Sequence, residues 1–413
     1  MNISKHISKD RVFVNNILIT IFIGVLVNFL NYLFNIFLAR NLESIDFSIY
    51  NAAIGIITLV QIPAIAIQTA ITKKVATNKK YDLKKFKLNS TLQLTGIAVV
   101  ISLLFFLFGD LIADVANISK VYILPLTLVV FASIVNPLAK GFLLGIEKIL
   151  SFNMVLLLET LLKFSIGYLA LYWTTDMQLI ILAFALPQIL SLIFILPLVK
   201  TGGKEVPTKQ LKLNYKHISL IFTTFLLLNV PFTIDLILVN PEVRASYGAL
   251  ALVGKIVYFG SVTIASLMIS KLANSKKKLR RKTLVISLIV SGLTGITISI
   301  LYLIFSKEIV QIVFDGMYIE IVSYIVPYAI AMTAYALSYM VITSLLVEDS
   351  YIHIYFLIFL SVLQVVLFKI NNSSLYDAFL NQIIVYGILS IFIFFILIFY
   401  IFNNNGKISK GKN

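Results

Sequence analysis

Residues 12–39 read VFVNNILITIFIGVLVNFLNYLFNIFLA, a stretch without a single charged side chain. A helix needs about 20 apolar residues to cross the roughly 30 Å hydrocarbon core of a bilayer. The stretch is long enough for this, and it is longer than the short apolar region of a cleaved signal peptide. It therefore predicts a first membrane-spanning helix.

The composition of the whole chain has the same character. Of the 413 residues, 60% are hydrophobic and 13% are charged, whereas soluble domains average about 45–50% apolar and about 25% charged residues. This composition excludes a soluble enzyme and a disordered chain. The sequence has no cysteine, no clustered histidines and no phosphate-binding loop, so we expect no disulfide, no metal site, no cofactor and no ATPase activity within this chain.

Further apolar stretches recur along the chain at short intervals. Together with the first they predict about twelve membrane-spanning helices, at residues 12–39, 48–71, 88–109, 121–139, 150–172, 177–199, 217–239, 247–270, 283–305, 319–346, 352–368 and 378–402.

Basic residues are distributed unevenly between these stretches. The 34 Lys and Arg against 18 Asp and Glu give a net charge of +16. With the N-terminus inside, most basic residues fall on the inner side, and the outer side receives Arg40, Lys120, Arg244, Lys307 and Lys369. Because cytoplasmic loops are enriched in Lys and Arg, we expect a multi-pass protein with both termini in the cytoplasm. The charge marks topology and contact with membrane lipids, and nucleic acid is not an expected partner.

A lysine-rich loop divides the sequence into two predicted lobes, 1–206 and 207–413. With an offset of 200 residues, Asn35–Arg40 aligns with Asp235–Asn240. Six spans per lobe make the lobes parallel repeats, related by an axis along the membrane normal. The predicted fold is thus an all-α polytopic membrane protein with two six-helix lobes, and we expect a cleft between them that serves alternating access.

The hairpin Asn35–Tyr50 reads NIFLARNLESIDFSIY. It resembles the opening motif of polysaccharide-biosynthesis flippases in the multidrug/oligosaccharidyl-lipid/polysaccharide exporter superfamily. In that motif an Ala-Arg-Leu-Gly run is followed by an acidic residue, an aromatic residue, Gly and Tyr. Asn41 and Ser48 depart from the expected Leu and Gly. The turn 141–148 and the segment 235–255 are similar to the family's inner turn after span four and to the opening of its second half.

The resemblance implies a MATE-like fold and a transporter, not an enzyme. It implies that the chain flips an oligosaccharide repeat unit linked to undecaprenyl pyrophosphate across the bacterial inner membrane. It further implies an O-antigen, capsule or other surface polysaccharide pathway, with polysaccharide-assembly proteins as candidate partners. Two alternatives stay open. One is a drug/cation antiporter of the same superfamily, and the other is a membrane-embedded polysaccharide polymerase or acyltransferase, to which His353 and Asp349 would belong.

Four ionisable residues fall within predicted spans, where they mark either pairs or substrate pathways. Glu159 and Lys163 lie on one helix face. They form a self-neutralising pair, or Lys163 binds a pyrophosphate while Glu159 titrates. Asp235 and Lys255 lie on neighbouring spans. Either the two residues form an ion pair, or Lys255 stays unpaired and binds an anionic headgroup. Arg40, at the outer end of span one, contacts phosphate or extends to the membrane interface. We predict Lys163, Lys255 and Arg40 as substrate-binding, and Glu159 and Asp235 as ion-coupling residues.

Amide side chains form two polar stripes. Asn28, Asn31 and Asn35 share one face of the first span, and Gln61 and Gln68 lie on the second. Amides both donate and accept hydrogen bonds, which suits polyhydroxylated sugars, so we predict these five residues to bind substrate. The alternative is hydrogen bonding between helices, worth about 0.6 kcal/mol on average in membrane proteins.

Overall fold

The computed structural model describes residues 3–78, 81–174, 176–199, 213, 215–261, 268, 277–347 and 352–409, which are almost entirely helical. Within these residues, ten segments are long and apolar enough to cross a membrane: Phe22–Asn41, Ser44–Thr77, Lys84–Leu107, Lys120–Gly145, Ile149–Trp173, Met177–Leu198, Lys282–Phe314, Ile319–Leu345, His353–Ile370 and Leu375–Leu397. They coincide with ten of the twelve predicted spans. The predicted seventh span contains a shorter apolar helix, Phe222–Thr233, and part of the eighth lies outside the described residues.

Packing divides the chain into two compact units, Met1–Leu226 and Leu227–Asn413. The division falls within α11 (Tyr215–Thr233). The lobe boundary predicted at residue 206 lies within 200–212, outside the described residues, and stays a prediction.

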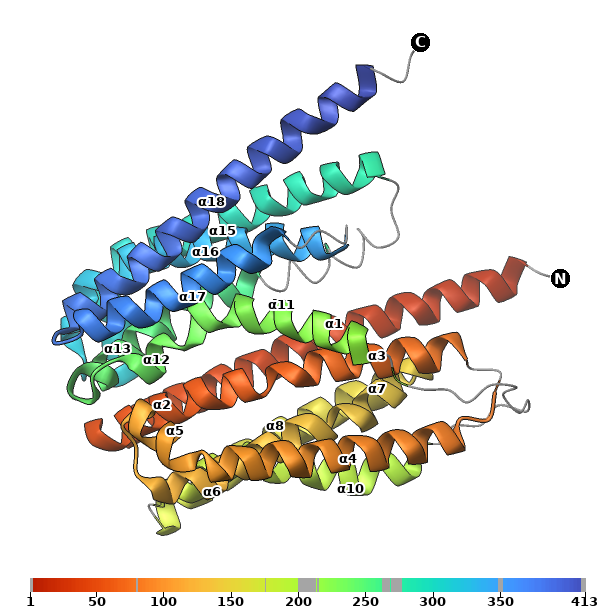
Figure 1. The fold of residues 1–413 in the computed structure, drawn as a ribbon, viewed down its shortest axis with the longest axis horizontal. Coiled ribbons are helices and arrows are strands. Elements are labelled where there is room, and N and C mark those ends of the chain that lie inside the picture. Colours follow the sequence, from red (N-terminus) through yellow and green to blue (C-terminus); the bar gives the residue numbers. More distant parts are fainter. Residues whose placement is uncertain are drawn as a thin grey trace. The chain divides into compact units, whose positions relative to one another are not determined.

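Unit 1 is a bundle of apolar helices (Figure 1). In it α1 packs against α8, α3 against α7, α4 against α6, and α10 against α8. Its helices are α1 (Ile3–Asn41), α2 (Ser44–Val60), α3 (Ile62–Thr77), α4 (Lys84–Leu107), α5 (Gly109–Ala116), α6 (Ile123–Val135), α7 (Pro137–Gly145), α8 (Ile149–Leu169), α9 (Met177–Leu182) and α10 (Leu186–Leu198).

Three predicted spans of unit 1 are each broken into two helices. The breaks precede Pro63, Pro137 and Pro187, which occupy the first turn of α3, α7 and α10. Proline has no N–H to donate and its ring clashes with the preceding turn, so it is tolerated at the start of a helix and not in its interior. The breaks place Gln61 and Asn136 at helix junctions within the membrane-spanning segments.

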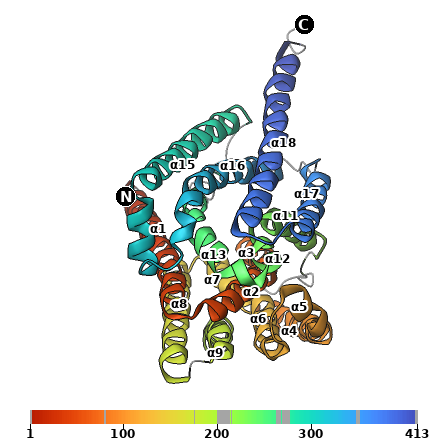
Figure 2. The same ribbon diagram turned by 90° about the vertical axis from the view of Figure 1, so that its left-hand side faces the viewer.

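Unit 2 is built around α16 (Val322–Val347), which packs against α13 (Pro241–Gly254), α15 (Lys277–Phe314) and α18 (Leu375–Ser409). Figure 2 shows α17 (Ile352–Ile370) beside α18. The short α12 (Asp235–Leu238) follows α11 after a break at Ile234, three residues beyond Pro231.

Large apolar side chains remain exposed on both units. Trp173 is 80% exposed, Leu303 70% and Phe395 64%. A monomeric soluble protein rarely exposes apolar surface on this scale. These faces are suited to contact lipid tails, so the polar side chains that the helices turn inward are the candidates for function.

Candidate functional site

The ammonium of Lys163 lies between α8 and α1 in unit 1. Its Nζ donates a hydrogen bond to Asn31 Oδ1, and it lies 4.8 Å from the ring centroids of both Phe34 and Phe184. Among the described residues, Lys163 contacts no carboxylate. The aromatic faces and the amide stabilise the charge but do not neutralise it.

The close approach of α1 and α8 at this point depends on Gly167, one turn after Lys163. A Cβ at Gly167 would lie 2.4 Å from Cε2 of the Phe34 ring. Because the glycine has no side chain, the wholly buried Phe34 packs directly against α8. This contact places the ring, and Asn31 one turn before it, beside Lys163.

The predicted amide stripe on α1 bonds mainly to other helices and to its own backbone. Asn31 and Asn35 donate their Nδ2 groups to the carbonyls of Val27 and Asn31, at 2.9 and 2.7 Å. Asn35 Oδ1 accepts from the buried hydroxyl of Tyr50 on α2 at 2.5 Å. Asn28 is exposed. Asn31 and Asn35 therefore make the predicted alternative contacts between helices, and their role in substrate binding stays a prediction.

The remaining substrate-binding candidates of unit 1 lie apart from this contact. Gln61, at the junction of α2 and α3, and Gln68 on α3 are both half-buried. Arg40 is exposed in the last turn of α1. Their predicted contacts with sugar and phosphate stay predictions.

The predicted pair between Glu159 and Lys163 is wrong. Glu159 Oε2 accepts from Lys140 Nζ on α7 at 2.6 Å, and Oε1 accepts from Asn136 Nδ2 at 2.9 Å and from Ser191 Oγ on α10. The carboxylate is thus fully bonded where α7, α8 and α10 meet. Hydropathy places Lys140 in an inner loop, but its side chain is only 14% exposed within α7.

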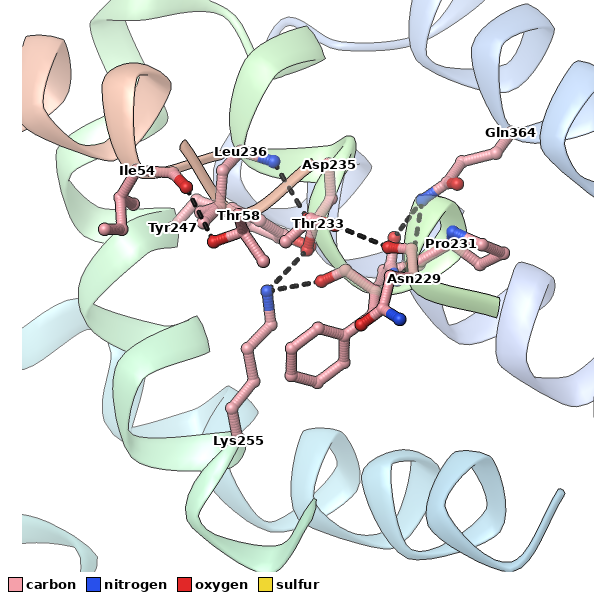
Figure 3. Close-up of polar contacts among 12 residues, drawn as sticks. Ile54, Thr58, Asn229, Pro231, Thr233, Asp235, Leu236, Tyr247, Lys255 and Gln364 are labelled. Carbon is pink, nitrogen blue, oxygen red and sulfur yellow. Dashed lines mark hydrogen bonds and ion pairs between the residues drawn. The ribbon is translucent and has the colours of Figure 1, made fainter. Parts of the chain in front are cut away.

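Asp235 and Lys255 of unit 2 form the pair that the sequence allows (Figure 3). Lys255 Nζ lies 3.5 Å from Asp235 Oδ2 and 2.6 Å from the carbonyl oxygen of Phe232. Tyr247 donates its hydroxyl to Asp235 Oδ2 at 2.8 Å. Asp235 is wholly buried and Lys255 is 7% exposed, so the alternative of an unpaired Lys255 is wrong.

Arg244 is a second buried cation that contacts no carboxylate among the described residues. Wholly buried in α13, it donates from Nε to the carbonyl of Val239 at 3.0 Å, and from Nη2 to those of Ile237 and Val239 at 3.1 and 2.8 Å. Its Nη1 has no hydrogen-bond partner in the described residues. The charge distribution places Arg244 on the outer side, but hydropathy does not report which face of a helix is covered and so does not predict that Arg244 is buried.

The buried and half-buried charged side chains considered above therefore fall into two groups, those with an opposite charge beside them and those without one among the described residues. Both membrane-embedded carboxylates are occupied by a lysine, Glu159 by Lys140 and Asp235 by Lys255. Lys163 and Arg244 are left with neutral partners only. The described interior therefore offers cations, and not carboxylates, to a further ligand.

No family model matches this sequence, and no curated protein matches it. Solved structures, by contrast, are similar to this chain over most of its length. The lipid II flippase MurJ in an inward closed conformation is similar over 92% of this chain and 87% of its own, with 15% identity and a TM-score of 0.70. An outward-facing multidrug resistance MATE family transporter of the MOP superfamily is similar over 91% of this chain and 92% of its own, with 13% identity and a TM-score of 0.63.

A further similar structure is that of a MOP superfamily transporter from Pyrococcus furiosus, whose binding pocket is described as having reverse polarity. The similarity covers 92% of this chain and 92% of that transporter, with 12% identity and a TM-score of 0.62. At these identities the likeness concerns the fold. The protein is therefore a multi-pass helical membrane protein with the MATE-like fold that the sequence predicts, which it shares with the MurJ flippase and with MATE transporters.

Proposed function

We propose that this protein is a transporter that flips a polyprenyl-pyrophosphate-linked oligosaccharide across the bacterial inner membrane by alternating access, for the assembly of surface polysaccharide. Two observations support this class of function. The fold is similar to that of a lipid II flippase and of MOP superfamily transporters, and the hairpin Asn35–Tyr50 resembles the opening motif of polysaccharide flippases. Both termini lie in the cytoplasm in this proposal, because the basic residues gather on that side.

The observation that carries the choice of substrate is the environment of Lys163. A cation in a membrane-embedded bundle is costly, and such residues usually pair or line a substrate path. Lys163 has an amide and two aromatic rings around it and no counter-charge among the described residues. A pyrophosphate would provide that counter-charge through charge-assisted hydrogen bonds. In that complex the Lys163 ammonium would exchange its hydrogen bond to Asn31 for one to the pyrophosphate.

A drug/cation antiporter is less well supported. Such a protein needs a carboxylate to bind Na⁺, H⁺ or a cationic drug. Glu159 and Asp235, the two candidates, already bind Lys140 and Lys255. A cationic drug would also be repelled by the unpaired charge of Lys163.

A membrane-embedded enzyme based on His353 has little support. The His353 side chain is wholly buried in α17, and neither ring nitrogen has a hydrogen-bond partner within the described part of the chain. Its proposed partner Asp349 lies outside the described residues. A buried imidazole without an orienting partner is poorly suited to general acid–base catalysis.

The proposal is tested by depleting the protein in the organism that carries its gene. Lipid-linked oligosaccharide should accumulate on the cytoplasmic face, and surface polysaccharide should fall. Complementation with the wild-type chain and with Lys148→Gln, which removes an exposed lysine, should restore both, whereas Lys163→Gln should not. Normal surface polysaccharide in the depleted strain would exclude the proposed function.

A further inference from the structure

The break between α11 and α12 changes the hydrogen bonding of main-chain groups in unit 2. In an unbroken helix the N–H of Leu236 would bond to the carbonyl of Phe232, four residues earlier. Here Leu236 donates to Asp235 Oδ1 at 2.9 Å. The Phe232 carbonyl is thereby open to a side chain, and it accepts from Lys255 Nζ at 2.6 Å.

A second carbonyl at the same break is open in the same way. Pro231 O accepts from Gln364 Nε2 at 3.2 Å and from Gln382 Nε2 at 2.7 Å, as Figure 3 shows for Gln364. The Oε1 atom of Gln364 is buried and has no hydrogen-bond partner among the residues that the structure describes. The break therefore frees the carbonyls of Phe232 and Pro231 for contacts with side chains, and Lys255 contacts the Phe232 carbonyl together with the Asp235 carboxylate.

Such a set of oxygens is suited to a cation. Hard cations take carboxylate, carbonyl and amide oxygens as ligands, and interrupted membrane helices hold monovalent cations through their open carbonyls. In this protein the cation present is the ammonium of Lys255. It lies closer to the Phe232 carbonyl than to the carboxylate, at 2.6 against 3.5 Å, and 4.5 Å from the centroid of the Phe232 ring.

We propose that the Asp235–Lys255 pair is a monovalent-cation site that the chain fills with its own lysine. The compact ammonium of lysine takes the place of a dissolved ion, and the site is wholly buried at Asp235. The wild-type protein then binds neither Na⁺ nor K⁺ here, and removal of the ammonium opens the site to them. This proposal does not depend on the transported substrate, and it assigns Asp235 a role other than exchangeable ion coupling.

A cation site filled by lysine and an ordinary ion pair differ in how the protein responds to salt once the lysine is removed. If the pair is merely a salt bridge, loss of the lysine leaves a buried carboxylate without a counter-charge, which is strongly destabilising, and salt does not reverse the loss. If the oxygens form a cation site, a small cation from solution replaces the ammonium and restores stability by binding to the folded state.

The test is the melting temperature of the purified full chain in choline chloride, NaCl and KCl at equal ionic strength. Wild type should melt at the same temperature in all three salts. Lys255→Met should melt lower in choline chloride and recover in NaCl or KCl in a saturable, concentration-dependent way. The double variant Asp235→Asn with Lys255→Met should not respond to the cation, nor should Lys163→Met, whose lysine has no carboxylate beside it.

Three results would overturn the proposal. The first is a Lys255→Met protein that melts at one temperature in all three salts. The second is a Lys255→Met protein that does not fold in any salt although the double variant folds. The third is binding of radioactive Na⁺ to the wild type that Asp235→Asn abolishes, because Lys255 would then not fill the site.

Discussion

Glu159 pairs with Lys140, whose Nζ lies 2.6 Å from its Oε2, and not with Lys163, which follows four residues later on the same helix. Helical spacing would favour the neighbour on α8. The pairing with α7 instead frees Lys163, which turns to α1 and donates to Asn31. The exchange of partners leaves α8 with a neutralised Glu159 and with a Lys163 that contacts no carboxylate among the described residues. The proposed recognition of an anionic headgroup rests on Lys163.

Loss of the charge at Lys163 should impair transport without unfolding the protein. Hydrogen bonds to charged groups contribute about 1.5–3 kcal/mol, which corresponds to roughly a 10- to 100-fold weaker apparent affinity for the pyrophosphate lipid. We expect this loss in Lys163→Gln, partial activity in Lys163→Arg and full activity in Lys148→Gln, measured as flipping against substrate concentration. Equal apparent affinity in Lys163→Gln and wild type would remove Lys163 from the binding site.

The Glu159–Lys140 pair should be needed for stability. Removal of one partner of a buried ion pair costs about 3–5 kcal/mol, whereas removal of both charges is often nearly neutral. Lys140→Met should therefore lower the melting temperature strongly. The double variant Lys140→Met with Glu159→Gln should recover most of the loss, because Asn136 and Ser191 still have an amide oxygen to bond. A double variant no more stable than Lys140→Met would refute this account of the pair.

Gly167 should be intolerant of a side chain. An added Cβ would lie 2.4 Å from the Phe34 ring, and overpacking of this kind costs about 1–3 kcal/mol. Gly167→Ala should lower the melting temperature, and it should weaken flipping because Asn31 and Phe34 move away from Lys163. Gly24→Ala on α1 is the matched control, since its Cβ would meet nothing within 4 Å and alanine favours the helix by about 1 kcal/mol. The same melting temperature in both variants would contradict the close contact.

The topology can be tested with single cysteines, because the chain contains no cysteine of its own. Lys148→Cys and Lys369→Cys replace exposed lysines that charge distribution places on opposite sides of the membrane. A membrane-impermeant thiol reagent added to intact cells should label Lys369→Cys and spare Lys148→Cys, which should react after permeabilisation. The reverse pattern would place the termini outside.

Sequence patterns predicted the elements of this fold well. Ten of the twelve predicted spans coincide with described helices, because a run of about 20 apolar residues has few structural solutions in a bilayer. The Asp235–Lys255 pair was predicted as one of two alternatives, since both residues are costly at bilayer depth and lie on consecutive spans. The comparisons with solved structures agree with the predicted fold class.

Contacts between helices distant in sequence could not be predicted in the same way. The partner of Glu159 depends on how α7 and α8 are rotated about their axes, and hydropathy carries no information about that rotation. For the same reason, hydropathy places Lys140 in an inner loop. The break at Pro137 was visible in the sequence, but its consequence, an amide at Asn136 that bonds to Glu159, appears only when the helices are packed.

Flipping by the reconstituted protein shows directly whether the chain recognises an anionic headgroup. Proteoliposomes that contain the wild-type chain should move undecaprenyl-pyrophosphate-linked oligosaccharide between leaflets, and should not move an analogue with the same sugars and lipid but an uncharged linkage. Lys163→Gln should lose movement of the pyrophosphate lipid. If the wild type moves both lipids equally, or moves a cationic drug and neither lipid, the proposed recognition of an anionic headgroup at Lys163 is wrong.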